Sequence, residues 1–281
     1  MRYPGGKSYI IEKILPYFEQ YISSNTRFVD VFAGGLTVTS AVADAFPQIT
    51  HFHINDKDPG IASIWTCYLQ WPANLKAVLR QIDPSLENFY AIRNEVATTY
   101  SVPDNPGQMI QLAAKKIFLH QCSYSGLGVR GGPQGGNHQT GFTKIASNWN
   151  LEFQNKKINE FKSQFENKNF KENNCSCEDF EKIILSAKPN DFLYLDPPYF
   201  LRGKRLYQFF FKKEQHQRLA AVLKISTNPW VLSYDDMPYI RELYAWANIN
   251  TIVNANRMQM VDDGSGRKAA ITNELVITPK Y

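Results

Sequence analysis

Asp191-Phe192-Leu193-Tyr194-Leu195-Asp196-Pro197-Pro198-Tyr199 predicts a buried strand followed by a rigid loop. The first five residues form a short apolar run with aromatic content, as buried strands do. Two consecutive prolines donate no backbone hydrogen bonds, so they end the strand and fix the loop. The loop presents a carboxylate, a proline carbonyl and an aromatic face, which together suit a planar exocyclic amine and its base. A Pro-rich turn after a core strand is the alternative interpretation.

The residues directly after Tyr199 are basic and aromatic. The stretch from Phe200 to Lys213 contains five cationic side chains, five aromatic ones and no acid. Cations interleaved with rings suit phosphate contacts beside an unstacked base.

Strands and helices alternate from there to the end, which predicts a parallel sheet. We expect a helix over 215–225, a strand over 230–234, a helix over 239–246 and strands over 249–253 and 269–278. The turn Asp263-Gly264-Ser265-Gly266 predicts a hairpin between the last two strands.

The N-terminal part has the pattern of a nucleoside-binding βαβ unit. Strands are predicted over 27–32 and 51–54; Ala33-Gly34-Gly35 follows the first and Asp56 the second. The glycines let the backbone approach a ligand, and the carboxylate suits a ribose diol. The turn is not G-x-G-x-x-G, so a dinucleotide is not indicated. Upstream, Gly5-Gly6-Lys7 precedes a predicted helix that Pro16 should end early, and it brings amides and an ammonium close to an anion.

A mainly helical segment separates these two parts. Helices are expected over 61–70, 74–82, 86–99, 107–120 and 178–187, and the composition predicts two domains. Residues 1–60 and 186–281 form the α/β domain, and 61–185 form an inserted helical domain. The Lys- and Asn-rich stretch 154–174 contains balancing Glu and predicts a solvated linker or helix.

One window of the insert contains no acid. It lies between Asp104 and Glu152, and its part from Ser123 to Asn150 holds seven of the 16 glycines together with amide and aromatic side chains. Such a loop can lie against a polyanionic backbone and reach base edges. A flexible surface loop is the alternative.

Composition sets wide bounds. The 281 residues carry a net charge of +5 and are 43% hydrophobic, which is globular and permits an anionic partner. No apolar run approaches 18 residues, and the first residues leave no room for a signal peptide. The cysteines at 67, 122, 175 and 177 suggest neither disulfides nor a zinc site. We therefore expect a cytoplasmic protein with no metal and no membrane partner.

The chain resembles the Dam-like, group α DNA N6-adenine methyltransferases, with the motifs in the family's order along nearly its whole length. The resemblance rests on Arg2-Tyr3-Pro4-Gly5-Gly6-Lys7, Asp30-Val31-Phe32-Ala33-Gly34-Gly35, Asp56, Tyr124-Ser125-Gly126-Leu127, Asp196-Pro197-Pro198-Tyr199, Arg267-Lys268 and Glu274-Leu275. Two departures are that Leu36 stands where a second glycine is usual, and that the Arg of the recognition hairpin, Arg130 here, is displaced by about one residue.

The resemblance implies a Rossmann-like class I methyltransferase sheet, mostly parallel with a C-terminal antiparallel hairpin, and an inserted helical target-recognition domain. It implies transfer of methyl from S-adenosylmethionine to N6 of a flipped adenine in double-stranded DNA. The implied catalytic residues are Asp196, Pro197, Pro198 and Tyr199; the implied cofactor residues are Tyr3, Lys7, Asp30, Phe32, Gly34, Gly35, Asp56 and Asp196; the implied DNA residues are Tyr124, Ser125, Leu127, Arg130, Arg202, Lys204 and Arg205.

Two alternatives stay open at this point. N4-cytosine methylation needs an amine of the same local geometry, and a catalytically silent DNA-binding protein could keep the fold. A cognate restriction endonuclease is one candidate partner, and we expect the chain to act as a monomer.

Overall fold

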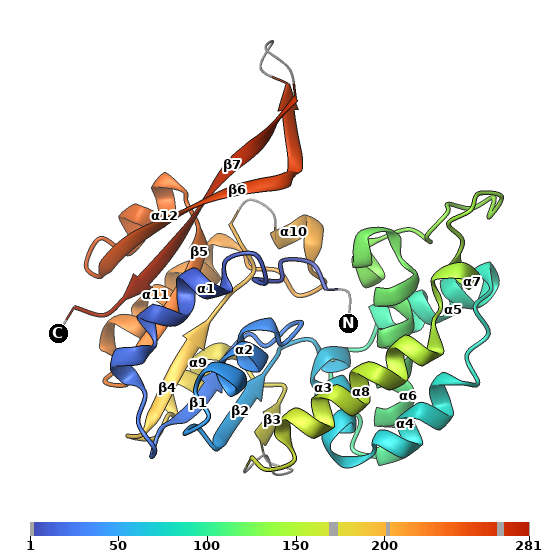
Figure 1. Cartoon of the computed structure of the whole chain (residues 1–281), viewed down its shortest axis with the longest axis horizontal. Helices are drawn as coiled ribbons and strands as arrows, with labels where there is room; N and C mark the ends of the chain where they lie inside the picture. Colours follow the sequence, from blue (N-terminus) through green and yellow to red (C-terminus); the bar gives the residue numbers. More distant parts are fainter. Residues whose placement is uncertain (1–2, 169–173, 201–202, 263–266, 281) are drawn as a thin grey trace.

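A seven-stranded mixed sheet forms the α/β part of the molecule (Figure 1). The computed structural model describes residues 3–168, 174–200, 203–262 and 267–280. The strand order is β3-β2-β1-β4-β5-β7-β6; β7 pairs antiparallel with β5 and β6, and the other neighbours are parallel. The strands are β1 (Arg27–Asp30), β2 (His51–Asn55), β3 (Cys175–Ser176), β4 (Asp191–Leu195), β5 (Trp230–Asp235), β6 (Asn248–Asp262) and β7 (Arg267–Thr278). The expected mostly parallel sheet with a C-terminal antiparallel hairpin is confirmed.

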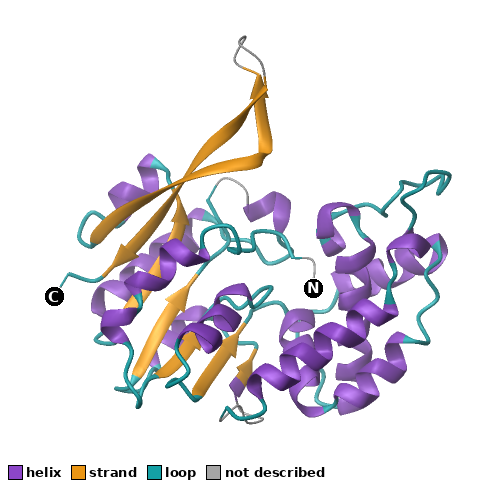
Figure 2. Cartoon of the chain, in the orientation of Figure 1, coloured by secondary structure: helices purple, strands orange, loops and turns teal. Residues whose placement is uncertain are grey.

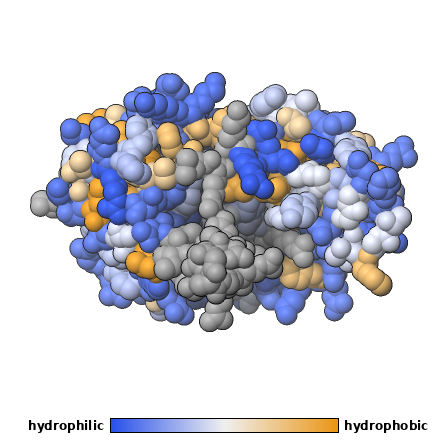
Figure 3. Space-filling model, turned by 90° about the horizontal axis from the view of Figure 1, so that it is seen from above, coloured by the Kyte–Doolittle hydropathy of each residue, from blue (hydrophilic) through white to orange (hydrophobic). Residues whose placement is uncertain are grey.

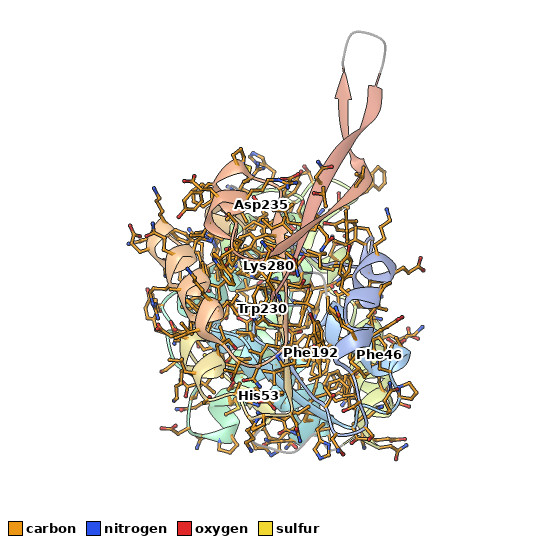
Figure 4. All side chains as sticks on the ribbon, turned by 90° about the vertical axis from the view of Figure 1, so that its left-hand side faces the viewer. Phe46, His53, Phe192, Trp230, Asp235 and Lys280 are labelled. Carbon is orange, nitrogen blue, oxygen red and sulfur yellow. The ribbon has the colours of Figure 1, made fainter. Side chains whose placement is uncertain are left out.

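The strand β4 lies at the centre of this sheet. All five of its residues are buried, which is why it appears in the sequence as an unbroken apolar run. Its Phe192 and Tyr194 pack with Phe18 and Phe28 on one face (Figure 4 labels Phe192 in the interior). Since β1, β2 and β4 are parallel neighbours, their carboxyl ends share one edge, and the predicted site residues follow those ends.

Helices lie on both faces of the sheet and in a separate group beside it (Figure 2). The helices are α1 (Ile11–Ile14), α2 (Thr37–Ala45), α3 (Pro59–Gln70), α4 (Pro72–Leu79), α5 (Leu86–Ala97), α6 (Pro106–Cys122), α7 (Ile145–Asn148), α8 (Leu151–Phe165), α9 (Phe180–Leu185), α10 (Gly203–Leu206), α11 (Lys213–Ile225) and α12 (Pro238–Leu243). The group beside the sheet consists of α3 to α8, with α6 packed against α3, α4 and α5.

The end of the helical segment differs from the sequence-based division of the chain. Residues 175–176 form β3, which pairs with β2, and α9 buries Phe180, Ile183 and Ile184 in the core cluster that contains β5 and α11. β3 is therefore a strand of the sheet and α9 packs in the core beside the sheet, whereas the predicted division assigns both to 61–185. The remainder of the division into two domains stays a prediction.

Two further local expectations concern α8 and the stretch beyond α6. The stretch at 154–174 is predicted to be a solvated linker or helix; α8 is a helix, but it buries Ile158, Phe161 and Phe165 in the main core. Beyond α6, the stretch that resembles the start of a recognition hairpin forms two 3-10 turns, Tyr124–Gly126 and Gly128–Arg130, and an antiparallel bridge from Ser123 to Pro133 joins its ends. The hairpin itself stays a prediction. The predicted turn at 263–266 lies outside the described residues.

No helix within the described ranges is long and apolar enough to cross a membrane. The face shown in Figure 3 mixes hydrophilic and hydrophobic residues around the part drawn in grey.

Candidate active site

A cavity of about 260 Å³ lies at the carboxyl ends of β1, β2 and β4. Most of the predicted site residues line it together, although they are far apart in the sequence. These residues are Tyr3, Lys7, Asp30, Phe32, Gly34, Gly35, Asp56, Leu127, Asp196 and Pro198.

The remaining predicted residues lie elsewhere or outside the description. Tyr124, Ser125, Arg130 and Arg205 are exposed. Pro197 is buried and Tyr199 half-buried, and both lie on the loop from Asp196 to Tyr199, the predicted catalytic loop. Arg202 and the side chain of Lys204 lie outside what the structure describes.

Lys7 and Asp196 form a close ion pair at the head of the catalytic loop. The Lys7 ammonium donates to both carboxylate oxygens of Asp196, at 2.6 and 2.7 Å. Lys7 is buried, with 3% of its side chain exposed. Burial raises the pKa of Asp196 to about 6, although the charge of Lys7 opposes this rise. Burial alone would lower the pKa of Lys7, but the carboxylates of Asp196 and Glu274 outweigh it, and the pKa is raised. The pair is therefore ionised near neutral pH.

Tyr199 is held at its hydroxyl and through contacts of its ring. Its hydroxyl donates to Oε1 of Glu274, which Ser233 Oγ also approaches at 2.7 Å. The Tyr199 ring stacks on the Tyr234 ring, with 6.0 Å between their centroids. The Lys7 ammonium lies 4.5 Å from the centroid of the Tyr199 ring. The ring that is predicted to meet a base is thus rigidly placed.

The turn after β1 is tight and is covered by Tyr3. Gly34 has φ +44, and a Cβ there would lie 2.6 Å from the Tyr3 ring; at Gly35 a Cβ would lie 2.9 Å from the Tyr3 Cβ. Leu36, which replaces the usual second glycine, has φ 62 and ψ 20 in the left-handed region and is buried. This conformation is strained for a leucine, so burial of its side chain has to offset the strain.

Asp56 is positioned by the backbone at the end of β2. One oxygen accepts from the Gly34 amide and the other from the Asp58 amide, each at 2.8 Å. Burial and the nearby Asp58 raise the pKa of Asp56 to about 7. Burial also raises the pKa of Asp30 to about 7, although Thr39 Oγ1 donates to Asp30 at 2.5 Å. The cavity therefore carries several carboxyl groups that can be neutral or ionised near pH 7.

The helical group contributes cavity residues that the sequence did not single out. Lys116 and His120 on α6 line the cavity, and Lys116 pairs with the buried Asp58 at 2.5 Å. The position of Lys116 inside the acid-free window is the sequence feature that could have identified it as a site residue. In the sequence Glu274 is part of a family motif only, because its contacts with Tyr199 and Lys7 depend on the fold.

The stretch after the catalytic loop connects the two sides of the cavity. Tyr207 donates from its hydroxyl to the Pro4 carbonyl at 3.1 Å, and Gln208 Nε2 donates to the carbonyls of Val96 and Ala97 at 3.3 and 3.2 Å. Arg130 Nε donates to the Tyr207 carbonyl at 3.1 Å, and its guanidinium lies 5.5 Å from the Phe210 ring centroid. The predicted base-reading and phosphate-binding stretches therefore contact each other.

Comparison with known proteins gives one family. A family model described as D12 class N6 adenine-specific DNA methyltransferase matches residues 3–259. A search of the curated proteins finds no match to the chain. The family match spans β1 to β5, most of β6, the helical group and the loop from Asp196 to Tyr199, so the chain belongs to the D12 class of N6 adenine-specific DNA methyltransferases.

Proposed function

We propose that the chain transfers methyl from S-adenosylmethionine to N6 of an adenine that has left the stack of double-stranded DNA. The observation that carries this proposal is the carboxylate of Asp196, fixed by two prolines at the rim of a cavity beside Tyr199. A sulfonium methyl donor would supply an activated methyl group, and the remaining requirement is to orient the attacking amine.

The residues around the cavity fit such a cofactor. Asp56 offers oxygens that suit a ribose diol, Gly34 and Gly35 allow close approach to the backbone, and the rings of Tyr3 and Phe32 supply apolar walls. The acidic groups of the cavity also suit a ligand that carries positive charge.

The catalytic loop would act by positioning the target amine. Asp196 and the Pro197 carbonyl would accept the two hydrogens of the amine, so that the nitrogen lone pair faces the methyl carbon. The bound sulfonium would supply the methyl group and leave as the thioether, and the proton that the nitrogen loses would pass to solvent. No covalent bond to the protein is needed. Tyr199 would stack on the base.

The helical group and the acid-free window would read the DNA sequence. The cations after Tyr199 would contact phosphates, which adds affinity without sequence information.

We also propose that the protein acts as a monomer in the cytoplasm. Light scattering of the purified chain, alone and on DNA, tests whether it is a monomer. Loss of viability when a candidate endonuclease is expressed without the methyltransferase would identify a restriction partner.

A methyl-transfer assay with nucleoside analysis tests the function. Radioactive S-adenosylmethionine and unmethylated DNA should give N6-methyladenine, and Asp196→Ala, purified in parallel, should give none. N4-methylcytosine as the product would contradict the proposed substrate. Absence of any methylated base in the wild-type reaction would favour a silent DNA-binding protein.

A further inference from the structure

Lys7 faces two carboxylates, the half-buried Asp196 and the buried Glu274. Its ammonium lies 2.6 Å from Asp196 and 3.5 Å from Oε1 of Glu274, and 3% of its side chain is exposed against 7% for Glu274. Glu274 comes from β7, far from the catalytic loop in the sequence. It is fixed there by donors from Ser233 and Tyr199.

The charges of this cluster do not balance. With all three groups ionised, one ammonium faces two carboxylates, which leaves one net negative charge beside the catalytic loop. Buried charges are costly unless they are paired and hydrogen-bonded. One of the two carboxylates can therefore accept a hydrogen bond from one more donor.

In the structure, Lys7 occupies the position that the target amine would need. Its ammonium takes both oxygens of Asp196 and lies over the Tyr199 ring. An incoming amine therefore has to share the Asp196 carboxylate with this ammonium or displace it. A buried ammonium moves readily only if another anion is within reach.

We propose that Glu274 is a positioning residue that accepts the Lys7 ammonium when the target amine occupies Asp196. This inference rests on the proposed function of Asp196 as the acceptor of the amine. The shift required is about 0.7 Å, because the 3.5 Å between the Lys7 ammonium and Glu274 Oε1 has to shorten to the roughly 2.8 Å of a charge-assisted hydrogen bond. Glu274 keeps its bonds to Ser233 and Tyr199, so the ring stays in place while the ammonium moves.

The charges predict the outcome of a double-mutant cycle. Glu274→Gln leaves Lys7 and Asp196 as a closed neutral pair, so the amine competes poorly for Asp196. Lys7→Met leaves two adjacent carboxylates, one of which should become protonated. The combination Lys7→Met with Glu274→Gln restores a single negative charge at Asp196. It should therefore recover activity that Glu274→Gln alone has lost, by ~10-fold, which lies within the coupling found between contacting residues.

The experiment measures kcat and KM for DNA in the wild type, both single variants and the double variant. Thermal unfolding of each variant checks its fold, and Glu181→Gln, an exposed glutamate on α9, serves as the matched control. A second readout avoids turnover. With S-adenosylhomocysteine bound, the affinities for duplexes carrying adenine or purine at the methylated position are compared, since purine lacks the amine. The wild type should prefer adenine, Glu274→Gln should lose that preference, and the double variant should regain it.

The outcomes separate this inference from the proposed function. Suppose that the wild type methylates adenine and that the losses of the two single variants simply add in the double variant. This result overturns the role of Glu274 and leaves the proposed function standing. An unchanged preference for adenine in Glu274→Gln does the same. A wild type that transfers no methyl to DNA overturns the proposed function, and this inference with it.

Discussion

In the proposed mechanism, burial and function oppose each other most directly at Asp196. Acceptance of an amine hydrogen requires the ionised carboxylate, but burial raises its pKa to about 6. Lys7 opposes this shift through two short hydrogen bonds, so removal of that cation should raise the pKa further. The state of the carboxyl group therefore depends on a residue 189 positions away in the chain.

A pH profile should show this dependence. A raised pKa means that the carboxylate is fully available only above about 6, so kcat should fall as the pH is lowered through that value. Lys7→Met should move the acidic limb to higher pH, because the charge that favoured ionisation has gone. The measurement is kcat between pH 5 and 9 at saturating DNA and cofactor. An acidic limb that stays in place in Lys7→Met would contradict the coupling.

Removal of the carboxylate should abolish methyl transfer. Asp196→Ala should lower kcat by ~10²-fold or more, since it deletes an oriented acceptor for the attacking amine. Circular dichroism and thermal unfolding should show a folded protein, because the side chain lies at the rim of the cavity. Near-normal turnover would mean that the loop is only a turn.

At Tyr199 the ring and the hydroxyl can be tested separately. Tyr199→Ala loses a stacking surface of ~1–3 kcal/mol, whereas Tyr199→Phe keeps it. Phe should therefore be tolerated much better than Ala, although it leaves Glu274 without the hydroxyl donor seen here. The comparison is kcat/KM for DNA in both variants. Equal losses would assign the function to the hydroxyl instead of stacking.

At the level of elements, the sequence predicts most clearly those that obey a single local rule. The strand β4 is an unbroken apolar run that is ended by prolines, and α1 ends at Ile14 beside Pro16, as expected. β3 is two residues long and exists only because β2 offers an edge, so no local pattern could reveal it.

The helix α8 was harder to predict because its polar composition concealed its buried face. Lysines and asparagines dominate the stretch, but Ile158, Phe161 and Phe165 recur at helical spacing and pack into the core.

The residues of the candidate active site also divide into those that a local pattern predicts and those that it does not. Asp56 and Asp196 follow from strand ends, whereas Glu274, Lys116 and His120 reach the cluster only through packing of distant elements.

The core role of α8 can be tested through stability. Phe161 is 6% exposed and contacts Trp65, Tyr68 and Phe165, so Phe161→Ala should lower the free energy of unfolding by about 3–5 kcal/mol. Phe153→Ala, at an exposed position on the same helix, is the control and should stay within about 0.5 kcal/mol. Urea titrations give both values. Equal effects would mean that α8 does not bury one face in the core.

The turn between β1 and α2 and the acidic end of β2 form the predicted cofactor site. Asp56→Ala should weaken binding of S-adenosylmethionine by ~10- to 100-fold, as expected for loss of hydrogen bonds to a charged group. Asp56→Asn, which keeps one accepting oxygen, should weaken it less. Calorimetry measures the cofactor affinity, and a DNA-binding assay should show little change. Unchanged cofactor affinity in Asp56→Ala would move the ribose elsewhere.

On the scale of the whole molecule, the active site lies between the sheet and the helical group. The stretch after the catalytic loop contacts both, through Tyr207 to the N-terminal loop and through Gln208 to α5. Arg130, from the acid-free window, bonds to the same stretch. DNA that binds to the acid-free window or to the stretch after Tyr199 would therefore affect the other of these two segments and the catalytic loop.

The two basic stretches should nevertheless differ in what they contribute to DNA binding. The acid-free window holds one Arg and one Lys between Ser123 and Asn150 among many amide and hydroxyl groups, which suits base edges, whereas the stretch from Arg202 to Lys213 holds five cations, which suits phosphates. Arg130→Ala should relax the sequence preference, because a bidentate base contact contributes about 1–3 kcal/mol of discrimination. Lys204→Ala or Arg205→Ala should lower affinity evenly and change the salt slope by about one.

The measurement is binding to the methylated site, once sequencing has identified it, and to duplexes with single substitutions, at several salt concentrations. Arg205→Ala is the matched control for Arg130→Ala, since both remove one exposed guanidinium. A change in the ratio of affinities between duplexes, and not in their mean, identifies the base-reading residue. Arg130 bonds to Tyr207 through Nε alone, so the other nitrogens of its guanidinium remain for a base. Equal losses on every duplex for Arg130→Ala would assign sequence recognition to another part of the helical group.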